Sequence, residues 1–453
     1  MLLHAFALPH VFHPTPLRAD SDTAVMLDAV RDTGGLAGAW RWFLGDWLLE
    51  NGFYRPLSSL SIALDYTLYG EAAWGFRLTN WLLMILTALG AFCVVRAYTG
   101  ITQYPNSDWL ALGVAVTLSL QQTGLIAVLS NWSTWWFVFA AILLNGFQYR
   151  LEIPRSARND MEAGSKIPVI PSRRRGISAS INLRWVLLLI AVGALFWGFD
   201  RLLETHYTRL ITWVPSRTAL LGTVLSVWAV YCLLRGVAER RWSWLGLGSV
   251  LYLLALGSYE QPITLIPILG ALAFWRRREW GAWGWKAFGA VALAGALILA
   301  LRLSLLPTEP TRYQQQQLRS SLTGPVSTYL TELIPPAGQW QYWASVGVNL
   351  EILLVDKQGW DNIVGAVLYL GVLGAFWRNR ALLGGALLWH ALAFLPMAFL
   401  HFFEHYMYLP QLGKTLFDVG LIAWGAQRLG VELERLILLL KETRVYAQAD
   451  TGR

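Results

Sequence analysis

The stretch LTNWLLMILTALGAFCVVRA, residues 78–97, decides the fold class because it is an apolar run of the length that crosses a bilayer. About 20 mostly apolar residues in a helix span roughly 30 Å of hydrocarbon. Comparable runs recur along the chain, at 109–129, 132–149, 185–199, 213–234, 242–258, 261–275, 287–305, 360–377, 381–400 and 406–427. The sequence therefore predicts an all-α fold, a polytopic transmembrane helical bundle of about 10–11 spans.

Composition supports this prediction and excludes other classes. Of the 453 residues 55% are hydrophobic and only 14% are charged, whereas a soluble domain carries roughly a quarter charged residues. The 25 tryptophans are typical of a protein whose rings lie at membrane–water interfaces. The net charge of +8 is explained by membrane sidedness, so we expect no nucleic-acid partner.

Sidedness follows from the loops, because lysine and arginine collect in cytoplasmic loops. One alternate set of loops contains Arg96, the arginines between 150 and 184, Arg235, Arg240, Arg241, Arg276–Arg278, Lys286, Arg378, Arg380 and the C-terminal cations. The other set carries the acids Asp20, Asp22, Asp28, Asp32, Glu204, Glu260 and Glu404. The first side is predicted to be cytoplasmic and the second extracytoplasmic.

The chain divides into loops and a bundle. We expect an extracytoplasmic first loop at 1–75, with an amphipathic helix near 57–69, followed by a transmembrane bundle at 76–430. Within the bundle we expect a disordered cytoplasmic insertion at 151–182 and a second extracytoplasmic loop at 306–340. Residues 431–453 are expected to form a cytoplasmic tail. The insertion resembles a translated palindromic repeat of the kind found in bacterial reading frames. Because Met1–Phe12 is too short to span, we expect a further helix upstream; the alternative is that the helices that follow pull this segment across the membrane.

Two acids in the first loop are candidates for chemistry. Asp20 and Asp22, in ADSD, have a spacing at which they can hold a divalent cation, or at which one acts as general base while the other tunes it. The alternative is a solvated acidic loop. No cofactor is certain, and a divalent cation at this pair remains open.

Ionisable residues at the rim of apolar segments form a second set of candidates, because such positions are costly and usually functional. They are Arg217, Glu260, Glu404, His405 and Lys414. Converging cations near the outer interface would suit an anionic group such as a lipid-linked phosphate. The alternative is a set of interhelical ion pairs, for example Glu260 with Arg217.

The segment HFFEH, from His401 to His405, matches the H-x-x-E-H pattern of zinc peptidases. Zinc would need a third ligand on the same side. The nearest downstream acids, Glu432 and Glu434, fall in the predicted cytoplasmic tail. An intramembrane zinc protease is therefore the least favoured of the hypotheses.

Four segments taken in order resemble GT-C fold membrane glycosyltransferases, in the protein-mannosyltransferase-like branch that includes transmembrane proteins with tetratricopeptide repeats. They are YRPLSSLSIALDYTLYGEAAWGFRLTN (54–80), WVPSRTALL (213–221), LLALGSYEQPITLIP (253–267) and EHYMYLPQLG (404–413). The resemblance covers most of the bundle in the same order, which makes it more specific than any single motif.

The resemblance implies transfer of a sugar from a polyprenyl-phosphate donor to an unknown protein, lipid or glycan acceptor, on the extracytoplasmic face of a bacterial plasma membrane. Asp20 or Asp22 would be the catalytic base. The donor phosphate and sugar would be held by Arg55, Arg217, Glu260, Glu404, His405, Tyr408 and Lys414. Membrane lipid would be the remaining partner.

The chain also departs from the family pattern. The acids form DSD rather than an adjacent pair, Tyr259 stands where the family has lysine, and His405 stands where it has arginine. A histidine carries charge only part of the time near neutral pH. The alternative function is thus a non-catalytic GT-C-like protein, or one that binds or transports lipid-linked sugars.

Overall fold

The computed structural model describes residues 2–122 except 103, 105 and 106, residues 208–318, and residues 377–424 except 378, 402, 421 and 422. Several predicted features lie outside these residues. They are the spans 132–149 and 185–199, almost all of 360–377, the insertion 151–182, the second loop beyond 318 and the tail 431–453.

The described part of the chain is helical, as the sequence predicts, with one isolated antiparallel bridge between Leu318 and Leu400. The α-helices are α1 (Leu8–Val11), α2 (Ser21–Asp32), α3 (Pro56–Tyr69), α4 (Ala73–Ile101), α5 (Ser107–Gln122), α10 (Thr208–Thr212), α11 (Arg217–Glu239), α12 (Trp242–Leu256), α13 (Leu265–Trp275), α14 (Arg277–Leu305), α15 (Arg312–Gln317) and α20 (Arg380–Ala398). The 3-10 helices are η1 (Leu2–Ala7), η2 (Leu17–Ala19), η3 (Gly35–Phe43), η5 (Val214–Ser216), η6 (Gln261–Thr264) and η8 (Glu404–Met407). Residues 411–420 are also helical.

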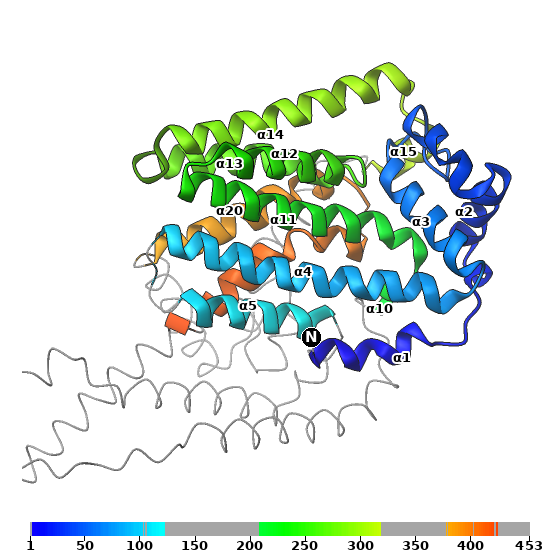
Figure 1. The fold of residues 1–453 in the computed structure, drawn as a ribbon, viewed down its shortest axis with the longest axis horizontal. Coiled ribbons are helices and arrows are strands. Elements are labelled where there is room, and N and C mark those ends of the chain that lie inside the picture. The colour runs from blue at the N-terminus through cyan, green and yellow to red at the C-terminus, as the bar shows by residue number, and fades with distance from the viewer. Residues whose placement is uncertain are drawn as a thin grey trace, which may run out of the picture.

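The long helices lie side by side, and the segment before α4 covers one end of them (Figure 1). Four described helices are long and apolar enough to cross a membrane: Ala73–Ile101, Val214–Glu239, Arg277–Leu305 and Arg380–Ala398. The apolar helices Ser107–Leu120, Trp242–Leu256 and Gln261–Trp275 are shorter. The structure therefore supports the membrane prediction by length and composition, while the total number of spans stays a prediction.

The two ends of the bundle differ in charge. The end where α4 finishes and α14 begins carries the basic residues of the loops that the sequence places on one side. Arg276 at this end lies within electrostatic reach of Tyr98, and the Tyr98 hydroxyl donates to the carbonyl of Ala381. We call this the basic end. The opposite end, covered by α2 and α3, we call the first-loop end (Figure 1).

The first loop has a small core of its own. Met26, Leu27 and Val30 of α2 pack with Ile62 of α3 and with Trp47. Pro56 suits the first turn of α3 because its missing N–H has no partner there in any helix. At the other end of α3, Gly70 adopts φ 61°, a conformation that favours glycine. These features explain why the first loop folds into a defined structure that packs against the bundle.

Small residues bring the bundle helices close together. A Cβ atom at Gly248 of α12 would lie 3.0 Å from the carbonyl oxygen of Ala229 on α11, and one at Gly413 would lie 2.5 Å from the carbonyl oxygen of Ala386 on α20. Such positions let helix backbones approach closely, as in membrane helix packing. Larger side chains there would force the helices apart.

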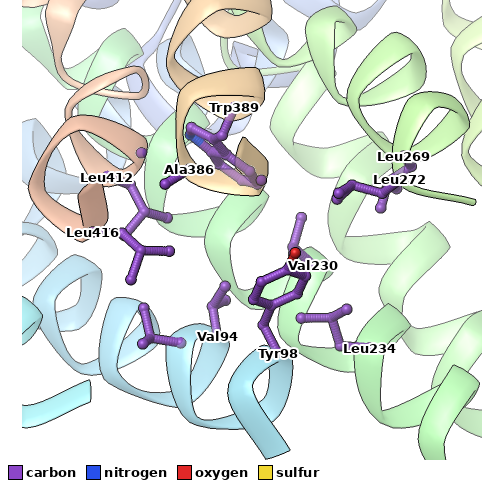
Figure 2. Close-up of a pocket in the computed structure, with 13 residues that line it drawn as sticks. Val94, Tyr98, Val230, Leu234, Leu269, Leu272, Ala386, Trp389, Leu412 and Leu416 are labelled. Carbon is purple, nitrogen blue, oxygen red and sulfur yellow. The ribbon is translucent and has the colours of Figure 1, made fainter. Parts of the chain in front are cut away.

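An apolar cavity of about 40 Å³ lies between α4, α11, α13, α20 and the helix at 411–420 (Figure 2). Its lining includes Val94, Val230, Leu272, Trp389 and Leu416. The one hydroxyl among the lining side chains, that of Tyr98, already donates to a backbone carbonyl. The cavity thus offers space near the basic end without groups that could carry chemistry.

Candidate functional site

The site begins with an ion pair at the first-loop end. Arg55 precedes α3, and its Nη2 lies 2.7 Å from Oε2 of Glu260; its Nε lies 3.0 Å from each carboxylate oxygen. The side chain of Arg55 is 11% exposed and that of Glu260 is 29% exposed. This pair, which we call the open pair, leaves part of the carboxylate accessible.

Aromatic rings surround the guanidinium of the open pair. Its central carbon lies 4.2 Å from the ring centre of Phe53, 4.6 Å from that of Trp47 and 4.9 Å from that of Tyr259. Such cation–π contacts hold a guanidinium in place and weaken its hydration. Arg55 is therefore fixed in one orientation, with its charge largely compensated by Glu260.

Backbone contacts join the two segments that supply the open pair. The N–H of Leu57 donates to the carbonyl of Gly257 at 3.0 Å, and the Ser58 hydroxyl donates to the carbonyl of Ser258 at 2.8 Å. Both partners of the pair come from segments that carry the family resemblance. The structure thus brings the YRP and SYEQP motifs together although they are far apart in the sequence.

A second cluster lies around His405 of η8. Its ring stacks on Phe403 and lies 5.5 Å, centre to centre, from Trp213, while the guanidinium of Arg209 lies 4.7 Å from the same Trp213 ring. Burial, with the nearby charges of Arg55 and Arg209, lowers the pKa of His405 to about 3. The ring is uncharged at neutral pH, so His405 cannot supply the cation that we expected of it. Arg209, which is exposed, is a cation beside the same Trp213 ring.

The acidic pair lies at the start of α2. Asp20 caps the helix, since its Oδ2 accepts from the Thr23 N–H at 2.8 Å and from the Thr23 hydroxyl at 2.6 Å. Asp22 makes no such contact; its pKa is raised by partial burial and by Asp20, and lowered by Arg209. The two acids therefore differ in role: Asp20 shapes the helix start, and Asp22 is the freer carboxylate, within electrostatic reach of Arg209.

The start of the second predicted loop contacts the same region. Thr311 begins α15 with a capping box, and its hydroxyl donates to the carbonyl of Asn51 at 2.9 Å. Tyr313 packs edge-on against Phe53 with ring centres 6.3 Å apart. The pKa of Tyr313 is raised by burial, lowered by Arg55 and raised by Asp22. Tyr313 therefore lies within electrostatic reach of both Arg55 and Asp22, and so connects the open pair with the acidic pair.

Arg217, in contrast, belongs to a closed network. Its Nη2 lies 2.7 Å from Oδ2 of Asp65, its Nε donates to Oδ1 of Asn80, and its Nη1 donates to the Ser61 hydroxyl. Its Nη2 also donates to a backbone carbonyl, and its side chain is 0% exposed. Arg217 pairs with Asp65, not with Glu260 as the ion-pair alternative proposed. We call Arg217 and Asp65 the closed pair, because this guanidinium is fully buried and four of its five N–H donors are bonded inside the protein, which disfavours a role in binding phosphate.

Two further candidates, Tyr408 and Lys414, have partners outside this cluster. The Tyr408 hydroxyl accepts from Nε2 of Gln122 on α5 at 2.9 Å. Nζ of Lys414 lies 2.7 Å from both carboxylate oxygens of Asp418, four residues later on the same helix. Lys414 is thus buried and neutralised locally, which removes the basis for expecting it at a phosphate. The side chain of Glu404 lies outside the described residues.

The described residues contain no group of three or more His, Cys, Asp or Glu side chains arranged to hold a metal ion. At the H-x-x-E-H segment, the backbone N–H of His401 donates to the carbonyl of Gln317, and the His405 ring packs among aromatic rings. The zinc hypothesis therefore gains no support from the geometry.

Comparisons with protein-family models, with curated proteins and with solved structures found no match for this chain. The GT-C resemblance therefore rests on the four sequence segments and stays a prediction.

Two residues of these clusters, Arg209 and Asp65, are not among the candidates that the sequence predicts. Arg209 sits four residues before Trp213, and this i, i+4 spacing is the signal that predicts contact between them on a helical turn. Asp65 is a lone acid within the otherwise apolar segment of α3, a position that indicates a buried partner. Both signals are in the sequence; Asp65 lies within the resembling segment 54–80, and Arg209 lies outside all four segments.

Proposed function

We propose that this protein is an integral membrane glycosyltransferase that moves a sugar from a polyprenyl-phosphate donor to an acceptor on the extracytoplasmic face. The observation that carries the proposal is the gathering of a free carboxylate, Asp22, an exposed cation, Arg209, and the open pair at the end opposite the basic loops. The order of the resembling segments supports it independently.

The chemistry assigns Asp22 as general base. The acceptor hydroxyl gives its proton to the Asp22 carboxylate, its oxygen bonds to the anomeric carbon, and the bond from that carbon to the phosphate oxygen breaks. The polyprenyl phosphate leaves with the electron pair. A raised pKa suits Asp22 for this role, since a base works best when its pKa approaches the working pH.

The departing phosphate needs a cation that is not already neutralised. Arg209 fits because its guanidinium is exposed and is oriented by the Trp213 ring. A guanidinium presents several donors in a plane and binds phosphate oxygens in pairs. Preorganised positive charge at a leaving group is often the largest single contribution to catalysis.

The sugar would lie beside the open pair. The accessible part of the Glu260 carboxylate can accept from sugar hydroxyls, and the half-buried ring of Trp213 offers an apolar surface against which a pyranose can pack. Arg55 holds Glu260 in position for this contact. By the positive-inside rule the site faces away from the cytoplasm, in our proposal across a bacterial plasma membrane.

A turnover assay with matched variants tests the proposal. The full-length protein in proteoliposomes is incubated with polyprenyl-phosphate mannose and a membrane extract as the acceptor source, and the release of polyprenyl phosphate is measured. Asp22→Asn is expected to lower turnover by about 100-fold or more. Asp32→Asn, on an exposed acid of the same helix, is the control and should leave turnover unchanged.

Arg209→Gln should act on the donor more than on the base. We expect KM for the donor to rise about tenfold and turnover to fall, because the lost cation contacts the phosphate in both the ground state and the transition state. Full activity of both Asp22→Asn and Arg209→Gln would overturn the proposal.

A second function is favoured by one observation: His405 is uncharged where the resembling family carries arginine. A site with a weaker phosphate grip suits a protein that binds or transports a lipid-linked sugar. Under this alternative the parent protein retains the donor in a binding assay but releases no polyprenyl phosphate. Retention should then fall in Arg209→Gln and persist in Asp22→Asn.

A further inference from the structure

The basic end of the bundle carries more positive charge than its acids compensate. Segments 235–244 and 274–286 together contain seven lysines and arginines and two glutamates. Both glutamates are occupied: Glu239 pairs with Arg235, and Glu279 pairs with Arg276 at 2.9 Å. Arg241 also lies 3.8 Å from Glu239, whereas Arg240, Arg277 and Arg278 are exposed and have no acidic partner among the described residues.

Lys286 is the most defined of these cations. Its Nζ lies 4.1 Å from the ring centre of Trp283 and 4.7 Å from that of Trp242, and the two rings lie 5.4 Å apart. The rings come from different helices, α12 and α14, so the ammonium is held where the helices meet. An aromatic ring attracts the cation through its face and, unlike a carboxylate, does not take up its hydrogen-bond donors. The Lys286 ammonium therefore keeps N–H donors for an anion.

Arg240 is a second cation in the same segment of the basic end. It follows α11 with φ 55°, a left-handed conformation that is unusual for a residue other than glycine, and its side chain is exposed. Among the described residues it has no acidic partner. Arg240 stands two residues before Trp242, whose ring contacts Lys286, so the chain brings a second cation close to this contact.

Exposed aromatic side chains occur in the same two segments as the cations. Trp242 is 62% exposed, Phe274 61%, Trp285 45% and Trp275 41%. Tryptophan side chains exposed at the end of apolar helices are typical of the headgroup level of a bilayer. A water-soluble phosphate would not need these rings, whereas a phospholipid presents both an anionic headgroup and apolar chains.

Arg277 and Arg278 extend the positive surface. Gly281 breaks α14 with φ 53° and ψ −143°, so these arginines lie on a short turn separate from the main helix. Both are exposed and have no acidic partner in the part of the chain that the structure describes. Each cation near an anionic membrane surface adds attraction for its headgroups.

We propose that Arg240, Trp242, Trp283 and Lys286 form a binding site for the phosphate headgroup of an anionic phospholipid, with Arg277 and Arg278 adding longer-range attraction. We call it the headgroup site. It lies at the basic end, away from the open pair, and does not depend on the proposed transferase activity. A phospholipid bound there helps to hold this end of the bundle at the membrane surface.

Native mass spectrometry of the full chain in detergent tests the site, with phosphatidylglycerol and phosphatidylcholine supplied at equal concentration. We expect the parent to retain phosphatidylglycerol in preference. Arg240→Gln and Lys286→Gln should each lower this retention about fivefold, the factor that one surface cation contributes. Lys286→Arg keeps the charge and should retain the lipid.

Arg312→Gln is the matched control, because Arg312 is an exposed arginine of α15 at the first-loop end. Its substitution should leave retention unchanged. The proposal is overturned if Lys286→Gln retains as much phosphatidylglycerol as the parent, or if Arg312→Gln loses as much as Lys286→Gln. Displacement of the lipid by excess inorganic phosphate would identify a free-phosphate site and would also overturn it.

Discussion

Two arginines lie near the first-loop end, and each pairs with a carboxylate from a distant segment, but their surroundings differ. Arg217 is 0% exposed and Asp65 is 4% exposed, with all of the guanidinium's nitrogens bonded. Arg55 and Glu260 are 11% and 29% exposed and lie among aromatic rings. The closed pair is complete without a ligand, whereas the open pair has capacity left. Sequence motifs alone rank these two arginines equally.

Breaking the closed pair should have the largest effect on stability. Arg217→Met leaves the buried carboxylate of Asp65 without a counter-charge, which costs about 3–5 kcal/mol of unfolding free energy. The double variant Arg217→Met, Asp65→Leu should be more stable than the single variant, because no charge remains buried. Chemical denaturation in detergent measures both. Equal stability of Arg217→Met and the parent would show that the network is not closed.

Acid should act on the cluster beside the open pair. The pKa of His405 lies at about 3 in the folded protein and near 6.5 in the unfolded chain, so the neutral ring contributes stability in full above pH 6.5. That contribution is lost as the pH falls from 6.5 toward 3, at up to about 1.4 kcal/mol per unit. His405→Phe should remove this part of the slope between pH 7.5 and 5. His13→Asn, on an exposed histidine, should keep the parental slope; an unchanged slope in His405→Phe would contradict the burial.

The open pair should respond more in function than in stability. Glu260→Gln replaces one charged partner while leaving hydrogen-bond capacity, so we expect a loss of about 1–2 kcal/mol in unfolding free energy. Turnover of the lipid-linked donor should fall more steeply than this loss of stability explains. Denaturation and the donor assay on the same preparation separate the two. The comparison fails if Glu260→Gln is as destabilised as Arg217→Met and turns over donor normally.

Substitutions of Asp20 should have the smallest effects on stability, and they separate a structural role of this residue from a chemical one. Asp20→Ala removes the cap of α2 and should cost about 1 kcal/mol, whereas Asp20→Asn retains a capping side chain and should be close to neutral. If Asp20 only shapes the helix, Asp20→Asn keeps turnover while Asp22→Asn loses it. Loss of turnover in Asp20→Asn at unchanged stability would instead make Asp20 part of the chemistry.

The sequence predicts the helices better than it predicts which side chains contact each other. The apolar run at 78–97 lies within α4, and the segment at 57–69 lies within α3, because local composition and the flanking Pro56 and Gly70 are enough to define a helix. The pairing of Arg55 with Glu260 joins residues 205 positions apart, and no local pattern encodes it.

The candidate site also shows that the sequence does not reveal which residues pair with each other. The cost of placing Arg217 and Lys414 in apolar segments predicts a function, but it equally predicts a buried partner, and both residues have one. The spacing of Lys414 and Asp418 was readable as an i, i+4 pair. Asp65 is separated from Arg217 by about a third of the chain, so only packing reveals their contact.

The most direct test of the account is the release of polyprenyl phosphate from polyprenyl-phosphate mannose by the parent and by Asp22→Asn, measured side by side in proteoliposomes with a membrane extract as acceptor. Release by the parent that falls about 100-fold or more in Asp22→Asn is the predicted result. Equal release by the two proteins would contradict the assignment of Asp22 as the base and, with it, the placing of the reaction at the first-loop end.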